Sequence, residues 1–520
     1  MDRLKKFFAN GILLTAVALI TRYVSVSFNV YLSNQIGTVA MGVFTLISSV
    51  YGFALTLATS GISLATTKLV SEAMGRQEIG EKTFSSISHI MKKSITLSLS
   101  ISFLTSCLLF LTAEFIGRTI LNDIRTIPCL KILAVSLVPI AISSSLSGYF
   151  TAIRKVYRNA VVQILGQASR IYLSVYLLSR VVASDVKSAC IAIVIATVIS
   201  ELICFAFHAL GFIKEQKRVK STYIHKNSKD KGVSKKLIGI TLPVALSAYV
   251  RSALITIEHL LIPWGLERSG VGRNASLAAY GTIHSVIFPL VLFPSAISSS
   301  FAGLLVPEVS ESDAANDSSR IERIVERVLK TVLIYSIGTA GIMICLSYEF
   351  ATVMIPKSDA ASFIVMIAPL IPVMYLDTSV DSILKGLGYQ FYGMVINVID
   401  AFLSVILVWL LLPRFGVMGY IITVYFTELL NAALSITKLI CVTRPKIKLG
   451  DWIIKPILSA ILSCAALRYL LSFFGSFAQN KTEFFFHVFL LAILYLCLLV
   501  IFKAISPRKI KTSILGFIRA

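Results

Sequence analysis

Two arginines stand inside long apolar runs of the sequence, where an ionisable side chain is costly. Arg22 lies in a run over about residues 10–34, and Arg251 in a run over about residues 236–262. A charge at the centre of a bilayer costs about 2.5–3.5 kcal/mol on insertion scales, so it usually faces a cavity or a partner. Because a guanidinium binds phosphate oxygens with paired hydrogen bonds, both arginines are candidate contacts for a diphosphate. The alternative is that each pairs with an acid, for example Glu201.

A second group of polar residues follows one face of a predicted helix over residues 156–180. Gln163, Gln167 and Arg170 are spaced at i, i+4 and i+7, which places them in one stripe. Amides and a guanidinium offer the mixed donors and acceptors that sugar hydroxyls require. We therefore predict a saccharide contact here, with hydrogen bonding between membrane helices as the alternative.

Acidic residues gather in apolar runs of the second half of the chain, at Glu258, Asp377, Asp381, Asp400 and Glu428. Asn397 and Asp400 are spaced at i, i+3 and share a helix face. Because hard cations take oxygen ligands, Glu258, Asn397 and Asp400 are candidate ligands of a coupling sodium ion, or carriers of a proton. Two alternatives are an ion pair of Glu258 with Arg251 and a helix-end cap formed by Asp381 with Lys385.

The composition shows which elements must position these groups. The chain has 520 residues, of which 56% are hydrophobic and only 14% charged, and its mean hydropathy is +0.83. A soluble domain has roughly 25% charged residues. The net charge of +23 comes from Lys and Arg in short loops between apolar runs, so we predict no nucleic-acid partner. The eight cysteines form no CxxC pair, which argues against a structural zinc site.

About fourteen apolar runs are long enough to cross a bilayer, which predicts an all-α polytopic membrane protein. Most Lys and Arg residues fall in segments that share one side if both termini are cytoplasmic, and this distribution predicts that orientation. The predicted spans cover residues 10–34, 39–65, 89–113, 126–150, 156–180, 188–213, 236–262, 275–305, 328–352, 362–386, 389–412, 416–440, 452–474 and 482–503.

An internal repeat predicts two lobes of six helices each. GISLATTKLVSEA, from Gly61, resembles AISSSFAGLLVPEVSES, from Ala296. Six helices per copy is an even number, so the copies share one orientation, as in parallel-repeat transporters. Arg22 and Arg251 then occupy equivalent helices. The predicted organisation is an N-terminal lobe over residues 1–213, a basic cytoplasmic linker over 214–235, a C-terminal lobe over 236–446, and two further helices with a basic tail over 447–520.

Several segments permit a family assignment. TIEHLLIPWGLERSGVG (Thr256 to Gly272), FPLVLFPSAISSSFAGLLVPEVSES (Phe288 to Ser312) and LKGLGYQFYGMVINVID (Leu384 to Asp400) resemble the oligosaccharidyl-lipid flippase superfamily. This superfamily also contains polysaccharide exporters and multidrug antiporters, and IEHLLIP and LFPSAISSS are typical of its sporulation branch. IHSVIFP (Ile283 to Pro289) departs from the expected pattern, where a glycine and a methionine would stand.

The resemblance implies a two-lobed helical bundle around a central cavity, in the bacterial cell membrane. It implies that the chain is no enzyme but a flippase for a polyprenyl-diphosphate-linked saccharide such as lipid II, acting in spore cortex synthesis. The expected partners are the membrane lipids around the helices, and cell-wall synthesis enzymes are candidate protein partners. Related lipid II flippases place a cation site between the helices equivalent to those of Glu258 and Asp400.

No cofactor is expected, and the chain has no GxxxxGK[ST] loop for ATP. Sodium, protons or the membrane potential remain as drives, and outward movement of anionic cargo gains about 2.3 kcal/mol per charge per 100 mV. The alternatives are a flippase for another lipid-linked polysaccharide, a cation-coupled multidrug antiporter, a membrane glycosyltransferase and a scaffold. Paired arginines argue against cationic drugs, and a glycosyltransferase needs a large acidic loop that is absent from the sequence.

Overall fold

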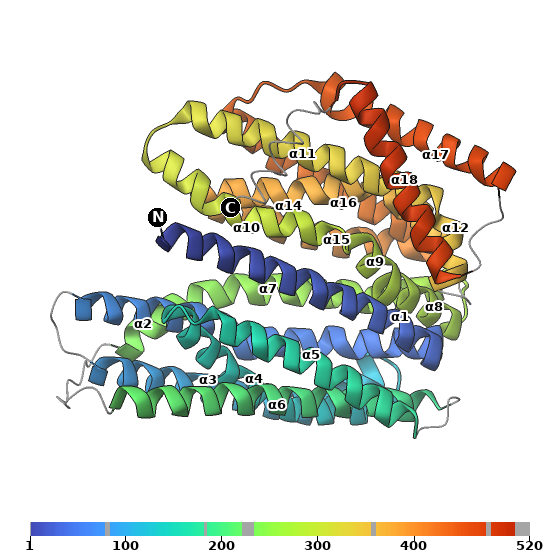
Figure 1. Cartoon of the computed structure of the whole chain (residues 1–520). Helices are drawn as coiled ribbons and strands as arrows, with labels where there is room; N and C mark the ends of the chain where they lie inside the picture. The colour runs from blue at the N-terminus through green and yellow to red at the C-terminus, as the bar shows by residue number, and fades with distance from the viewer. Residues whose placement is uncertain are drawn as a thin grey trace. The chain divides into compact units, whose positions relative to one another are not determined.

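A computed structural model describes residues 2–78, 84–180, 185–220, 233–354, 360–474 and 480–504; for residues 2–19 and some others inside helices only the backbone is described. The described residues form helices and short connections without any strand, which confirms the predicted all-α class (Figure 1). The helices up to the middle of the chain are α1 (Asp2–Thr59), α2 (Ile62–Glu78), α3 (Phe84–Phe115), η1 (Ile116–Ile120), α4 (Thr126–Ala152), α5 (Val156–Leu178), α6 (Val186–Lys220) and α7 (Val233–Arg268).

The second half of the chain contains shorter helical pieces between its long helices. They are α8 (Arg273–Gly281), the π-helical turn η2 (Thr282–Ile287), α9 (Phe288–Leu292), α10 (Ser295–Ala314), α11 (Ser318–Cys345), α12 (Ser347–Glu349), η3 (Phe350–Met354), α13 (Ala360–Ile367), η4 (Ala368–Leu370), α14 (Ile371–Gly386), α15 (Gln390–Phe415), α16 (Val417–Thr443), η5 (Gly450–Ile454), α17 (Lys455–Phe474) and α18 (Lys481–Ile501).

Thirteen stretches of the described chain are long and apolar enough to cross a membrane. The first, Ile20–Met74, has 55 residues; it includes the predicted span 39–65 and overlaps the predicted span 10–34. A helix of that length would reach about 80 Å, more than twice the hydrocarbon thickness of about 30 Å. Gly37, with φ 81° and ψ 163°, interrupts the helix between the two spans. The predicted count of about fourteen therefore agrees with the structure.

The backbone conformation at Gly37 is almost exclusive to glycine. No atom lies within 4 Å of where a Cβ would be, so the requirement is conformational rather than steric. The interruption coincides with a boundary between two compact units, one containing residues 1–38 and 265–520 and the other Val39–Trp264. These boundaries differ from those of the predicted lobes, which remain a prediction about the repeat. The middle of the predicted linker, residues 221–232, and the tail, 505–520, lie outside the described residues.

Within the Val39–Trp264 unit, α4 packs against α2, α3 and α6, and α5 packs against α6. Its core joins side chains of α2, α3 and α4, including Leu69, Met91 and Phe150, with Val233 and Leu237 of α7. Short hydroxyl side chains supplement the apolar contacts: Ser145 of α4 bonds to Ser94 (3.0 Å) and Ser98 (2.6 Å) of α3. Such small polar residues allow membrane helices to approach closely.

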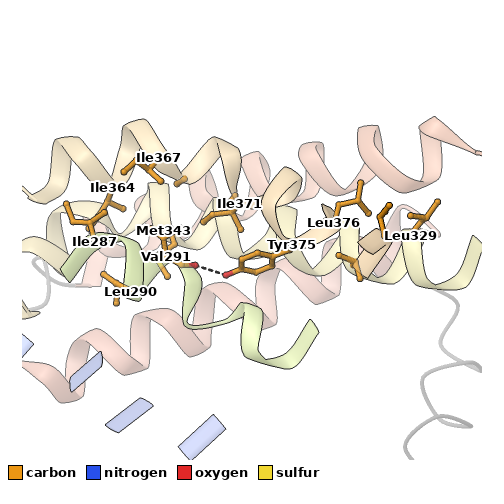
Figure 2. Close-up of a cluster of buried hydrophobic side chains, with 14 of the residues drawn as sticks. Ile287, Leu290, Val291, Leu329, Met343, Ile364, Ile367, Ile371, Tyr375 and Leu376 are labelled. Atoms are coloured by element: carbon orange, nitrogen blue, oxygen red, sulfur yellow. Dashed lines mark hydrogen bonds between the residues drawn. The ribbon is translucent and has the colours of Figure 1, made fainter. Parts of the chain in front are cut away.

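The other unit has its core around α14, which packs against α10, α11 and α16. Ile364, Ile371 and Tyr375 are fully buried there (Figure 2). Val26 and Val30 of α1 pack against this same cluster, and α17 and α18 pack against α11. The first segment of α1 is thus held by apolar contacts with helices that follow it by more than 250 residues.

Candidate functional site

Arg22 lies on the first segment of α1 and is partly buried. It forms no hydrogen bond or ion pair with any other residue that the structure describes. The ionisable group with which it interacts electrostatically is the Tyr375 hydroxyl of α14. The neighbouring Tyr23 ring contacts Phe293, with ring centroids 5.8 Å apart. Arg22 is thus a cation within a membrane helix that no described acid neutralises.

Arg251 is exposed on α7, in the other unit. Three hydrogen bonds on a different face of α7 hold that helix to the second segment of α1: Tyr249 to the Leu57 carbonyl (3.0 Å), Ser252 to Thr56 (3.2 Å) and Thr256 to the Ser49 carbonyl (3.3 Å). No ion pair joins Arg251 to another described residue, so the alternative of a pair with Glu258 is not seen. The two arginines belong to separate units, and a shared cavity stays a prediction.

The predicted stripe on α5 is partly assembled. Arg170 Nη2 donates a hydrogen bond to Gln167 Oε1 at 2.8 Å, and Gln163 is exposed one turn earlier. Arg170 Nε is buried without a hydrogen-bond partner. Glu201, on the adjacent α6, is the acid that interacts electrostatically with Arg170. The stripe therefore combines one exposed amide with a cation already oriented by its neighbours.

The three candidate cation ligands are divided between the units. Asn397 and Asp400 lie on α15, where the Asn397 amide donates to the Gly393 carbonyl at 2.7 Å, whereas Glu258 lies on α7 in the other unit. No group of three or more His, Cys, Asp or Glu suited to a metal ion occurs among the described residues. The predicted sodium or proton site remains untested by this geometry.

One alternative predicted for the acids is present in the structure. Lys385 Nζ lies 2.5 Å from Asp381 Oδ2, an ion pair across one turn of α14. Asp377, one turn earlier on the same helix, interacts electrostatically with Asp381 and Asp400. The acids of α14 and α15 therefore lie close enough to influence one another.

Sequence reasoning missed the polar contacts that surround the helix of Pro294. Tyr375 donates to the Val291 carbonyl at 2.7 Å (Figure 2). Tyr335 of α11 donates to the Pro294 carbonyl at 2.9 Å. His284 Nε2 lies 2.9 Å from the Tyr420 hydroxyl. The sequence did contain a signal for these contacts. A proline inside an apolar run leaves a backbone carbonyl without its helical donor, and a tyrosine buried in another apolar run needs an acceptor for its hydroxyl.

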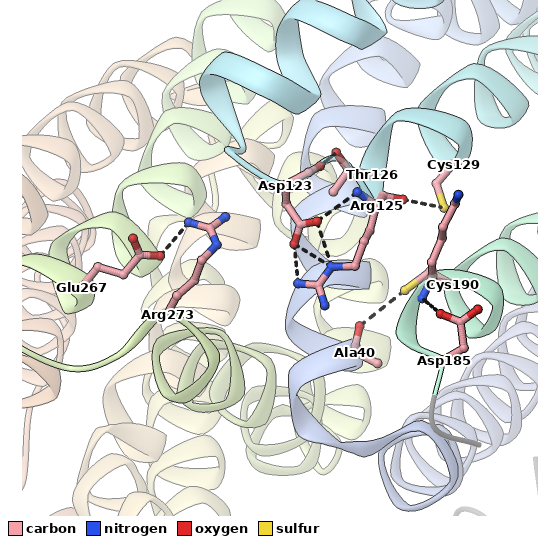
Figure 3. A network of polar contacts seen from close by, with 10 residues as sticks. Ala40, Asp123, Arg125, Thr126, Cys129, Asp185, Cys190, Glu267 and Arg273 are labelled. Atoms are coloured by element: carbon pink, nitrogen blue, oxygen red, sulfur yellow. Dashed lines mark hydrogen bonds and ion pairs between the residues drawn. The ribbon is translucent and has the colours of Figure 1, made fainter. Parts of the chain in front are cut away.

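A polar network that is separate from these groups fixes the connection between α3 and α4 (Figure 3). Arg125 donates to both oxygens of the buried Asp123 carboxylate, from Nε at 2.9 and 3.1 Å and from Nη2 at 2.6 Å. These hydrogen bonds with Asp123 raise the pKa of Arg125. In the other unit, Arg273 Nη1 pairs with Glu267 at 2.8 Å. Both pairs join residues close in sequence, which indicates a structural role.

The helices and their buried polar groups define the chain as a multi-pass membrane protein. Residues 7–312 match the family model "Polysaccharide biosynthesis protein", and residues 269–410 match the MatE model. The first match covers more than half of the sequence, so the chain belongs to the polysaccharide biosynthesis protein family.

Individual relatives agree with this family. The chain is 25% identical over 517 residues to Stage V sporulation protein B of Bacillus subtilis (strain 168), covering 98% of both chains. Its fold is similar to that of the lipid II flippase MurJ in an inward closed conformation, with a TM-score of 0.70, 13% identity, and coverage of 94% of this chain and 98% of that one.

A multidrug resistance transporter of the MATE family in its inward-facing conformation has a TM-score of 0.62 at 11% identity, covering 83% of this chain and all of the other. The predicted resemblance to the flippase superfamily is confirmed by these matches. The two solved structures are those of a transporter and a flippase rather than of enzymes, in agreement with the prediction that this chain is not an enzyme.

Proposed function

We propose that the chain carries the head group of a polyprenyl-diphosphate-linked saccharide, a peptidoglycan precursor such as lipid II, from the inner to the outer leaflet of the cell membrane. The observation that supports this most directly is Arg22, a partly buried guanidinium on a membrane helix with no acidic partner among the described residues. Burying a phosphate charge without compensation is prohibitive, and a guanidinium removes much of that cost. The similarity to Stage V sporulation protein B supports a role in spore cortex synthesis.

Arg251 and the α5 stripe of Gln163, Gln167 and Arg170 are the further contacts in this proposal. Arg251 would supply the second guanidinium for the diphosphate, and the stripe would offer hydrogen bonds to sugar hydroxyls. The lipid tail stays in the bilayer, and the two lobes alternate in exposing the site to either side. Cell-wall synthesis enzymes would supply and receive the cargo.

Both termini are proposed to be cytoplasmic, which makes outward movement of an anion downhill in a cell with a negative interior. Two phosphate charges gain about 4–5 kcal/mol at 100 mV. A sodium ion or proton at Glu258, Asn397 and Asp400 is the proposed means of resetting the empty carrier. Carboxylate and amide oxygens are suitable ligands for sodium.

The test is transport of fluorescent lipid II in proteoliposomes with an imposed membrane potential. Arg22→Ala is expected to lower the rate by about 10- to 100-fold, since a hydrogen bond to a charged group contributes about 1.5–3 kcal/mol. Arg118→Ala is the matched control, because Arg118 is exposed and pairs only with Glu114 across one helical turn. Wild-type rates in Arg22→Ala would refute the assignment of Arg22.

Two additional arms of the assay separate the alternatives. Transport of a polyprenyl-diphosphate glycan without a peptide, but not of lipid II, would identify another lipid-linked polysaccharide as cargo. Sodium-driven efflux of a cationic dye would identify a multidrug antiporter. For the ion site, Asp400→Asn is expected to remove any dependence of the rate on a sodium gradient, and an unchanged dependence would exclude Asp400.

A further inference from the structure

The membrane segment that contains α8, η2, α9 and α10 changes its hydrogen bonding at Phe293 and Pro294. Pro294 has no N–H, so the Leu290 carbonyl lacks its usual donor four residues later. The backbone bonds shift to a spacing of three residues: Phe293 N–H to Leu290 (3.2 Å), Ala296 N–H to Phe293 (3.1 Å) and Ile297 N–H to Pro294 (3.2 Å). The Ser295 hydroxyl donates to the Leu292 carbonyl at 2.7 Å. We call residues 290–297 the α9–α10 bend.

Two tyrosines from different helices hold this bend from outside. The Tyr375 hydroxyl of α14 donates to the Val291 carbonyl at 2.7 Å, before the proline, and the Tyr335 hydroxyl of α11 donates to the Pro294 carbonyl at 2.9 Å. Their rings stack with centroids 6.2 Å apart and an interplanar angle of 28°. Tyr375 is fully buried (Figure 2). A hydroxyl on each side of the proline therefore fixes the geometry of the bend.

The same bend is adjacent to the helix face that carries Arg22. Tyr23 contacts the Phe293 ring, and Val26 and Val30 pack against the core that contains Val291 and Tyr375. Tyr375 is also the electrostatic neighbour of Arg22. All of these residues belong to one compact unit, so their contacts are internal to it.

We propose that Tyr375 and Tyr335 are positioning residues for transport, which set the angle of the α9–α10 bend against the α1 segment that carries Arg22. They act on the backbone of the bend and not on the cargo. Their loss should therefore slow the conformational cycle while leaving cargo affinity nearly unchanged. We call the two hydrogen bonds of Tyr375 and Tyr335 to the bend the clamp. The effect of the clamp on turnover rests on the proposed function, whereas the clamp itself is testable without any cargo.

The first measurement is the turnover of lipid II in proteoliposomes, together with the Kd of the detergent-solubilised protein for lipid II. Tyr375→Phe and Tyr335→Phe are each expected to lower turnover by about 3- to 10-fold, the range that one neutral hydrogen bond provides, and to change Kd less than about twofold. The matched control is Tyr495→Phe: its hydroxyl donates to the Ile334 carbonyl at 2.7 Å, within the uninterrupted α11, and Tyr495 is buried like Tyr375, whereas Tyr335 is partly buried. That variant should change neither quantity.

The second measurement needs no transport. Nitroxide labels at Asn274 of α8 and Ser310 of α10, in a background with the exposed Cys441 and Cys497 changed to serine, report the distance across the bend by pulsed electron paramagnetic resonance. Tyr375→Phe and Tyr335→Phe should broaden or shift this distribution, and Tyr495→Phe should leave it unchanged.

The two measurements separate the two proposals. If the two clamp variants change the distance distribution but the unmodified protein does not transport lipid II, the clamp is supported and the proposed cargo is refuted. A wild-type distribution in both clamp variants, with wild-type turnover, would refute the clamp. Equal losses in Tyr495→Phe would also refute it, because the effect would then follow from any buried tyrosine.

Discussion

The interface between α2, α3 and α4 and the α9–α10 bend both use buried hydroxyls, but in different ways. In the first region, which we call the hydroxyl seam, Thr66, Ser94, Ser98 and Ser145 bond to one another between uninterrupted helices. Gly148 brings α4 against α2 in the same place: a Cβ there would lie 2.6 Å from the Ser63 carbonyl oxygen. At the bend, long tyrosine side chains reach backbone carbonyls of an interrupted helix.

This difference distinguishes an interface between closely packed helices from a pair of hydrogen bonds that set the angle of a bend. Serine and threonine hydroxyls are short, so they connect helices only at close approach and lose their bonds if the helices separate. A tyrosine hydroxyl stands at the end of a longer side chain, so it reaches a backbone carbonyl of the bend from a neighbouring helix without close approach of the two backbones. We therefore expect substitutions in the hydroxyl seam to lower stability, and substitutions at the bend to alter transport with little change in stability.

Gly148→Ala should have the largest effect on stability. The new methyl group would be too close to backbone atoms of Ser63, so α2 and α4 must separate, at about 1–3 kcal/mol. The free energy of unfolding in mixed micelles measures this. Gly52→Ala is the control, because nothing lies within 4 Å of its Cβ position, and alanine in a helix is neutral or stabilising by up to about 1 kcal/mol. Equal stability of the two variants would contradict the close approach.

Ser145→Ala should have an intermediate effect. It removes one hydrogen-bond partner from Ser94 and one from Ser98, although Ser94 keeps its bond to Thr66 and the Ser98 hydroxyl still donates to the Ser94 carbonyl at 2.8 Å. Hydrogen bonds between membrane helices contribute about 0.6 kcal/mol on average and up to about 1.7. Ser100→Ala controls for helix propensity, since Ser100 is exposed and bonds only to Thr96 of its own helix. A loss no greater than that control would show that the seam is held by packing alone.

Pro294→Ala should have the smallest effect on stability. Alanine restores an N–H that can reach the Leu290 carbonyl, worth about 1 kcal/mol, but loses the rigidity of proline, worth about 0.4–1 kcal/mol. The net change in unfolding free energy is then below about 1 kcal/mol, while the label distance across the bend should lengthen as the helix straightens. A destabilisation above about 2 kcal/mol would mean that the bend contributes as much to stability as the hydroxyl seam. That result would contradict the difference between the two regions.

The positions of the membrane helices were predictable because each needs an apolar run of its own. The predicted spans correspond to the described helices, and the 55-residue apolar stretch Ile20–Met74 divides into two spans at Gly37. The family resemblance was also readable from local segments such as LFPSAISSS. The sequence predicted a single span over residues 275–305, whereas the structure divides this segment by a π-helical turn and a bend.

The candidate site was predictable only as a set of residues. Spacing correctly placed Gln167 and Arg170 on one face, and it offered the Asp381–Lys385 pair as an alternative that the structure contains. It did not predict that Tyr375 interacts electrostatically with Arg22, because more than 350 residues separate them and no periodic pattern links them. The role of Arg251 and the relation of Glu258 to Asp400 remain predictions.

The sequence alone determined that this chain crosses the membrane many times, because hydrophobic transfer depends on each segment's own composition and length. It also determined which charged groups are costly enough to require a function. Only the tertiary structure decided that Arg22 has no acidic partner among the described residues and that two tyrosines hold the bend at Pro294. Such contacts join distant segments, and the packing of whole helices, rather than any local preference, brings them together.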